Sequence, residues 1–128
     1  MNPTELSILV IEDEPSVMSL VRTALERCGY QVVPATSGVD GLRLPASASY
    51  RGVISDMRMP AGVSGADVHA WIVANRPELG ARIIFITGDV VNDETASMLA
   101  RTGVPYVEKP FRVQQLIETV QQVFGKSA

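Results

Sequence analysis

Short apolar runs alternate with longer amphipathic segments along the whole chain. Ile8–Ile11 is a continuous apolar run, whereas in Pro15–Cys28 the apolar residues recur every three or four positions. The first pattern is typical of a strand buried on both faces, and the second of a helix that packs along one side. The pair of patterns repeats up to a final, strongly amphipathic helix from Val113 to Phe124. The other predicted strands are Gln31–Val33, Gly52–Ser55, Ile83–Ile86 and Val104–Val107, and the other predicted helices are Ser37–Leu44, Ala66–Asn75 and Asp93–Arg101.

This alternation limits the fold to the α/β class. Five strand–helix units with short connections predict a parallel sheet with helices on both faces. The chain has 128 residues, which is enough to bury one hydrophobic core. We expect a single domain over residues 1–128 with its core at about 7–124, and no output domain in this chain, because only Gly125–Ala128 follow the last helix.

Composition excludes several classes of function. The net charge is −3, whereas a nucleic-acid-binding domain usually carries a basic face. No apolar run approaches the roughly 18 residues that suggest a membrane span. A single cysteine, Cys28, cannot form an internal disulfide and suits a reducing compartment. We therefore expect a cytoplasmic protein with no membrane insertion and no direct contact with nucleic acid.

Polar residues follow four of the five predicted strands. In an open parallel sheet, ligands bind outside the carboxyl ends of the strands, so these residues are the candidate site. They are expected to converge on one edge and comprise acids, a hydroxyl and one cation: Glu12-Asp13-Glu14, Asp56, Thr87 and Glu108-Lys109-Pro110.

This set of residues favours phosphoryl chemistry with a metal. Carboxylates brought together repel one another unless a cation lies among them, and a set of oxygen ligands suits Mg²⁺ or Mn²⁺. A carboxylate such as Asp56 can attack phosphorus and form an aspartyl phosphate. Lys109 and Thr87 are a cation and a hydroxyl donor able to hold the phosphoryl oxygens. If Glu12 and Asp13 only capped the first helix, neither Asp56 nor Lys109 would be explained.

With these residues at the strand ends, the sequence resembles the receiver domains of bacterial response regulators, including the chemotaxis-regulator-like ones. The resemblance extends from about Ile8 to Phe124. The resemblance implies a doubly wound, flavodoxin-like (βα)5 fold with strand order 2-1-3-4-5. The matching pieces are Ile8-Leu9-Val10-Ile11-Glu12-Asp13-Glu14-Pro15, Asp56 with Pro60 four residues on, Ile86-Thr87-Gly88 and Tyr106-Val107-Glu108-Lys109-Pro110-Phe111.

The resemblance also implies a metal site. Glu12 and Asp13 would be the metal acids, and Asp56 would be both the phosphoacceptor and a metal ligand. The backbone carbonyl of Arg58 would complete the ligands that the protein gives to Mg²⁺ or Mn²⁺.

In addition, the charges of Arg58 and Asp89 lead us to expect that these two side chains pair across the mouth of the site.

A conformational switch is implied as well. Lys109 would bind the phosphoryl group, Lys109–Pro110 would be a cis peptide, and Thr87 and Tyr106 would form the switch pair. Signalling of this kind implies a sensor histidine kinase or a histidine phosphotransfer protein as phosphodonor, and no turnover of an external substrate. We expect a monomer or a weak dimer that phosphorylation strengthens. Either a stand-alone regulator or the receiver of a hybrid sensor kinase fits, and the downstream target stays open.

Three departures from the family pattern are visible. Glu12 stands where Asp is common, the segment Ala61–Gly65 looks one residue longer than usual, and Pro45 shortens the second helix. None of these changes touches the phosphorylation chemistry.

Other readings fit the residues less well. A haloacid-dehalogenase-type phosphatase needs an acid two positions after its nucleophile, where this chain has Arg58. An FMN carrier needs a phosphate loop after the first strand, where Glu12-Asp13-Glu14 would repel a phosphate. Phosphotransfer through His69 would need a helical bundle. A degenerate receiver that acts only as an adaptor is opposed by the complete residue set.

Overall fold

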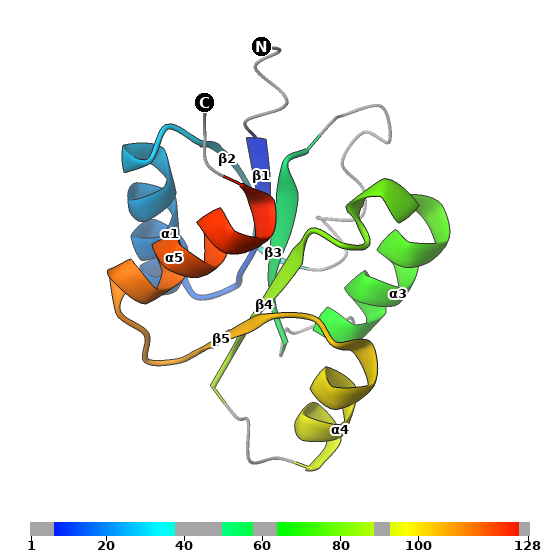
Figure 1. Cartoon of the computed structure of the whole chain (residues 1–128). Coiled ribbons are helices and arrows are strands. Elements are labelled where there is room, and N and C mark those ends of the chain that lie inside the picture. Colours follow the sequence, from blue (N-terminus) through cyan, green and yellow to red (C-terminus); the bar gives the residue numbers. More distant parts are fainter. Residues whose placement is uncertain (1–6, 38–49, 58–63, 89–92, 126–128) are drawn as a thin grey trace.

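The computed structural model describes residues 7–37, 50–57, 64–88 and 93–125, and it contains one parallel sheet (Figure 1). The strands lie in the order β2-β1-β3-β4-β5, so the predicted fold class and strand order are confirmed. The strands are β1 (Ser7–Ile11), β2 (Gln31–Ala35), β3 (Gly52–Asp56), β4 (Ile83–Thr87) and β5 (Tyr106–Glu108).

The helices follow the sequence pattern closely where they are described. They are α1 (Pro15–Arg27), α3 (Gly65–Asn75), α4 (Asp93–Thr102) and α5 (Val113–Phe124), with a 3₁₀ turn, η2 (Pro77–Leu79), after α3. α1 begins with a proline at its first position, where the missing N–H costs nothing. α3 begins with a capping box, in which Ser64 Oγ accepts from the N–H of Asp67 and Asp67 Oδ2 accepts from the N–H of Ser64. The helix expected at Ser37–Leu44 falls outside the described residues, apart from Ser37 itself.

The sheet separates two hydrophobic layers. α1 and α5 lie against one face, and α3 and α4 lie on the other side (Figure 1). Successive residues of β1 point to opposite layers: Ile8 and Val10 pack with α1 and α5, whereas Leu9 and Ile11 pack with the layer of α3 and α4. Because both faces are covered, all five residues of β1, β3 and β4 are buried.

The strand register brings the ends of the strands to one edge of the sheet. Ile11 pairs with Ser55, Asp56 with Ile86, and Thr87 with Glu108. The residues that follow β1, β3, β4 and β5 are therefore neighbours, as the sequence predicted. We call this edge the acidic edge and define it by Glu12, Asp13, Glu14, Asp56, Thr87 and Lys109.

β5 is shorter than the sequence suggested and begins two residues later. Its predicted start at Val104 is wrong, because the strand runs from Tyr106 to Glu108. Proline at position 105 has no N–H to give to a ladder, although its carbonyl still accepts from the N–H of Phe85. No helix in the described part of the chain is long and apolar enough to cross a membrane.

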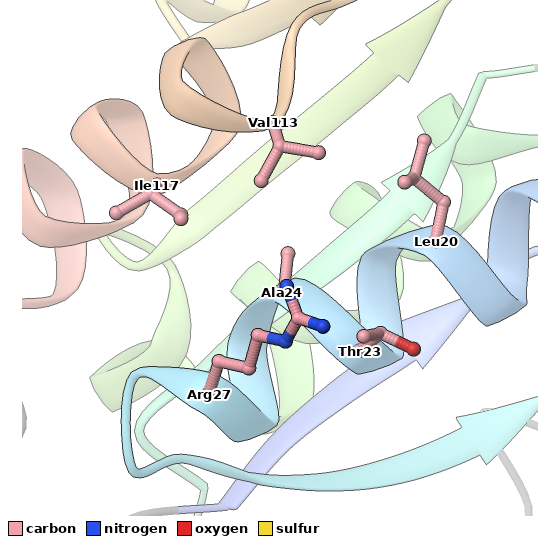
Figure 2. Close-up of a pocket in the computed structure, with 6 residues that line it drawn as sticks. All are labelled: Leu20, Thr23, Ala24, Arg27, Val113 and Ile117. Carbon is pink, nitrogen blue, oxygen red and sulfur yellow. The ribbon is translucent and has the colours of Figure 1, made fainter.

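An apolar pocket of about 180 Å³ lies between α1 and α5 (Figure 2). No carboxylate lines it, and the acidic edge contributes none of its residues. The acidic edge, rather than this pocket, therefore carries the groups able to do chemistry. The lining residues are Leu20, Thr23, Ala24, Arg27, Val113 and Ile117.

Candidate functional site

Four carboxylates meet at the acidic edge. One oxygen from each of Glu12, Asp13, Glu14 and Asp56 lies within 4.8 Å of the others. Glu12 and Asp56 are buried, at 1% and 5% exposure, whereas the side chain of Glu14 is exposed. Carboxylates at such distances destabilise one another in their charged forms unless cations compensate them.

The backbone fixes the two buried acids. The N–H of Glu12 donates to the carbonyl of Ala35 at 2.9 Å, which extends the pairing of β1 and β2 by one residue. Glu12 Oε1 accepts from the N–H of Glu14 at 3.1 Å. Asp56 is the last residue of β3, and Met57 after it donates to the carbonyl of Ile86 at 3.0 Å. Both carboxylates are thus held by regular strand ends rather than by free loops.

Lys109 supplies the cation of the site. Its Nζ lies 3.1 Å from Asp56 Oδ2, 3.2 Å from Glu14 Oε1 and 3.5 Å from Glu12 Oε2. The N–H of Lys109 donates to the carbonyl of Thr87 at 2.7 Å, which ties this residue to the end of β4. The Lys109–Pro110 peptide bond is cis, as the family resemblance implied.

Burial and charge shift the pKa values of Glu12 and Lys109. Burial raises the pKa of Glu12 to about 7; the Glu14 N–H and the Lys109 charge oppose this shift, and the Asp56 charge adds to it. Partial burial alone would lower the pKa of Lys109, but the hydrogen bond to Asp56 and the nearby acids raise it above its ordinary value. These shifts favour the positive form of Lys109 and make the charged form of Glu12 less stable than that of an ordinary glutamate.

The donor set fits a hard divalent cation. Glu12 Oε2 is buried and has no hydrogen-bond partner in the structure, a condition that costs free energy unless a cation or proton compensates it. All four clustered groups offer carboxylate oxygens, which Mg²⁺ and Mn²⁺ prefer, and none offers sulfur or imidazole nitrogen. Glu12, Asp13 and Asp56 are therefore brought together as the sequence suggested, and this edge of the sheet could hold a metal ion.

The residues expected to act as a switch lie in contrasting environments. Thr87, at the end of β4, is only 2% exposed, whereas Tyr106, at the start of β5, is 46% exposed. In the sheet Tyr106 pairs with Phe85, two residues before Thr87. Arg58, whose carbonyl was expected to bind metal, and Asp89, its expected ionic partner, both fall outside the described residues.

Two features of the site escaped the sequence analysis. A side chain at Gly65 would have its Cβ 2.8 Å from the carbonyl oxygen of Asp56, so only glycine lets α3 begin this close to the end of β3. The sequence shows a glycine there but not what it approaches. Glu14 was grouped with the acids, but its contact with Lys109 spans 95 residues and leaves no local signal.

Comparison with known proteins agrees with this geometry. The sequence model of the response regulator receiver domain family matches residues 8–121. A solved receiver domain from Clostridium thermocellum is 32% identical, with a TM-score of 0.77 and coverage of 92% of this chain and 93% of that one. The CheY-like receiver domain protein of Methanospirillum hungatei JF-1 shares the fold, with a TM-score of 0.81 at 22% identity and 92% coverage of both chains.

A relative of similar length also matches. The polar-differentiation response regulator DivK of Brucella ovis is 25% identical over 119 residues, which are 93% of this chain and 96% of that protein. The family match extends over nearly all of the described sheet and its helices, from β1 into α5. The chain therefore belongs to the response regulator receiver domain family.

Proposed function

We propose that this domain accepts a phosphoryl group on Asp56 from a phosphohistidine donor and signals by a change of shape. The observation that carries the proposal is the contact between Lys109 and Asp56, 3.1 Å apart among clustered carboxylates. A structural ion pair alone needs one acid for one lysine, whereas here further acids crowd the same cation. The arrangement suits a nucleophilic carboxylate whose neighbouring lysine can turn from the acids to an incoming phosphoryl group.

The transfer itself needs few protein groups. An oxygen of Asp56 attacks phosphorus, the P–N bond of the phosphohistidine breaks, and its electron pair stays on the leaving imidazole. Lys109 neutralises charge on the phosphoryl oxygens, and the hydroxyl of Thr87 donates to one of them. Mg²⁺ or Mn²⁺, when held by Glu12, Asp13, Asp56 and the carbonyl of Arg58, would neutralise the remaining charge.

The output is a shift between two conformations of the domain. When the Thr87 hydroxyl turns to the phosphoryl group, Tyr106 moves inward from its half-exposed position. This movement remodels the face formed by α4, β5 and α5. The partner upstream is a sensor histidine kinase or a histidine phosphotransfer protein in the cytoplasm, and phosphorylation strengthens at most a weak dimer. The domain turns over no external substrate.

The test is phosphorylation by acetyl phosphate, measured by intact mass. The wild-type protein should gain one phosphoryl group with Mg²⁺ and none with EDTA, and alkali should release the group as it does from an acyl phosphate. Asp56→Asn should gain none, while Asp67→Asn, which alters an exposed acid at the start of α3, should label normally. Full labelling of Asp56→Asn, or a stable phosphoester, contradicts the proposal. Hydrolysis of many equivalents per chain would instead indicate a phosphatase.

The switch has its own measurement. Beryllofluoride mimics the bound phosphoryl group, so its addition with Mg²⁺ should move the NMR signals of Tyr106 and of α4. If the Tyr106 signals stay unchanged at saturating beryllofluoride, the proposed Thr87–Tyr106 switch is wrong. The proposed role of Asp56 as phosphoacceptor is tested separately, by the labelling experiment.

A further inference from the structure

Resting on this proposed function, we propose that Glu14 competes with the phosphoryl group for Lys109. Glu14 would hold the lysine while Asp56 is unphosphorylated and release it when a phosphoryl oxygen takes its place. In this role Glu14 is a positioning residue: it touches neither donor nor phosphorus, and acts through Lys109.

The contacts of Lys109 support an exchange of this kind. An ammonium group has three N–H donors, and Lys109 uses them on Asp56 and Glu14, with Glu12 Oε2 at 3.5 Å. When Asp56 carries a phosphoryl group, Lys109 must turn at least one donor to the new oxygens. Glu12 is completely buried, so Glu14, with a side chain 56% exposed, is the acid that can give up the contact and return to water.

The local structure of Glu14 leaves its carboxylate available for this contact. Glu14 is the N-cap residue of α1, yet its side chain makes no capping hydrogen bond. Its backbone N–H donates to Glu12 Oε1 instead. The main chain of Glu14 therefore orients a buried acid, while its side chain spans to Lys109. These two tasks can be separated by mutation.

Two variants of Glu14 separate the contact from the charge, and a third variant is the control. Glu14→Ala removes both. Glu14→Asp keeps the charge but shortens the side chain by one methylene, and aspartate at an N-cap tends to turn to the first N–H groups of the helix instead. Glu26→Ala is the matched control, because Glu26 lies on the same helix, is half exposed and has its own ion pair with Arg22.

Two quantities are measured. The first is the dissociation constant for beryllofluoride at saturating Mg²⁺, and the second is the NMR signal of the Lys109 ammonium nitrogen in the absence of beryllofluoride. Glu14→Ala and Glu14→Asp should both bind beryllofluoride about two- to fivefold more tightly, the range expected for an exposed ion pair. Both should also shift the Lys109 signal and speed its hydrogen exchange with water. Glu26→Ala should match the wild-type protein in each measurement.

Other results overturn the inference. Unchanged beryllofluoride affinity in both Glu14 variants means that Glu14 does not compete for the lysine. Tighter binding in Glu14→Ala alone means that charge rather than contact matters. A loss of Mg²⁺ affinity as large as that of Asp13→Asn makes Glu14 a metal ligand. If the wild-type protein neither binds beryllofluoride nor accepts a phosphoryl group, the proposed function itself fails. The NMR signal of Lys109 tests the contact with Glu14 separately, because it is measured without any ligand.

Discussion

The two ends of the sheet treat their polar groups in opposite ways. At the acidic edge, four carboxylates lie close together and three of them contact Lys109, and a buried oxygen of Glu12 has no hydrogen-bond partner. At the other end, side chains that precede β2 and β3 donate hydrogen bonds to backbone carbonyls at the end of α5. Tyr30 Oη donates to the carbonyl of Gly125 at 2.5 Å, and Arg51 Nε donates to the carbonyl of Phe124 at 2.9 Å. We call this second region the C-terminal anchor and define it by Tyr30, Arg51, Gly52, Phe124 and Gly125.

The difference is consistent with a C-terminal anchor that stabilises the fold and an acidic edge that carries the proposed phosphoryl chemistry. Unpaired or repelling groups lower stability, and proteins keep them mainly where function needs them. The anchor satisfies helix-end carbonyls that would otherwise lack partners. We therefore expect mutations in the anchor to change stability without changing ligand binding. Mutations at the acidic edge should change ligand binding and, for the buried acids, should raise the stability of the metal-free protein.

The largest expected effect is in the anchor. Phe124 is buried against β3 at the end of α5, so Phe124→Ala should lower the free energy of unfolding by about 3–5 kcal/mol. Urea unfolding measures this loss. At a urea concentration where the variant is still folded, its Mg²⁺ and beryllofluoride affinities should equal those of the wild-type protein. A comparable loss of affinity would show that the two ends are not independent.

The second effect has the opposite sign and lies at the acidic edge. Burial raises the pKa of Glu12 from its usual 4.5 to about 7. Between these two pH values the folded protein therefore keeps a proton on Glu12 that the unfolded chain has released. The resulting stability is fully present below about pH 4.5 and is lost as the pH rises through about 7. Without metal, Glu12→Gln should remove this loss and be more stable than wild type at pH 8.

The measurement is urea unfolding in EDTA at pH 5 and pH 8. The wild-type protein should lose more stability than Glu12→Gln between these values, by on the order of 3 kcal/mol, since each pKa unit is worth about 1.4 kcal/mol. Taking the difference between the two proteins removes the contribution of His69, whose pKa burial lowers. Parallel pH profiles would mean that Lys109 already compensates a charged Glu12.

These two regions also differ in how far the sequence predicts them. The acidic edge was predicted because its residues stand at strand ends, and strand ends converge in any parallel sheet. The anchor was not predicted, because Tyr30 and Gly125 are 95 residues apart and a tyrosine near a strand has no fixed partner. Gly52 likewise reads as an ordinary strand residue, although its Cα faces the ring of Phe124.

A third mutation tests the packing of the anchor. A Cβ at position 52 would lie 2.4 Å from Cε1 of Phe124, which is closer than real contacts allow. Gly52→Ala should therefore cost about 1–3 kcal/mol of unfolding free energy, the usual range for overpacking. The double variant with Phe124→Ala is the control: if the collision is with the ring, Gly52→Ala should cost much less in that background. An equal cost in both backgrounds would place the strain in the β3 backbone instead.

The smallest expected effect isolates one hydrogen bond of the anchor. Tyr30 is 3% exposed, and its hydroxyl donates to the carbonyl of Gly125 just beyond α5. Tyr30→Phe keeps the ring packing and should lower the unfolding free energy by about 0.5–1.5 kcal/mol, because the carbonyl loses a partner. Hydrogen exchange should localise the change: amides in the last turn of α5 should exchange faster, while those of β1 and β3 should not. The beryllofluoride affinity should stay the same, because the lost bond lies at the far end of the sheet from Asp56. If that affinity changes while the amides of α5 do not, the anchor is coupled to the acidic edge, and the division of the sheet into a stabilising end and a reactive end is wrong.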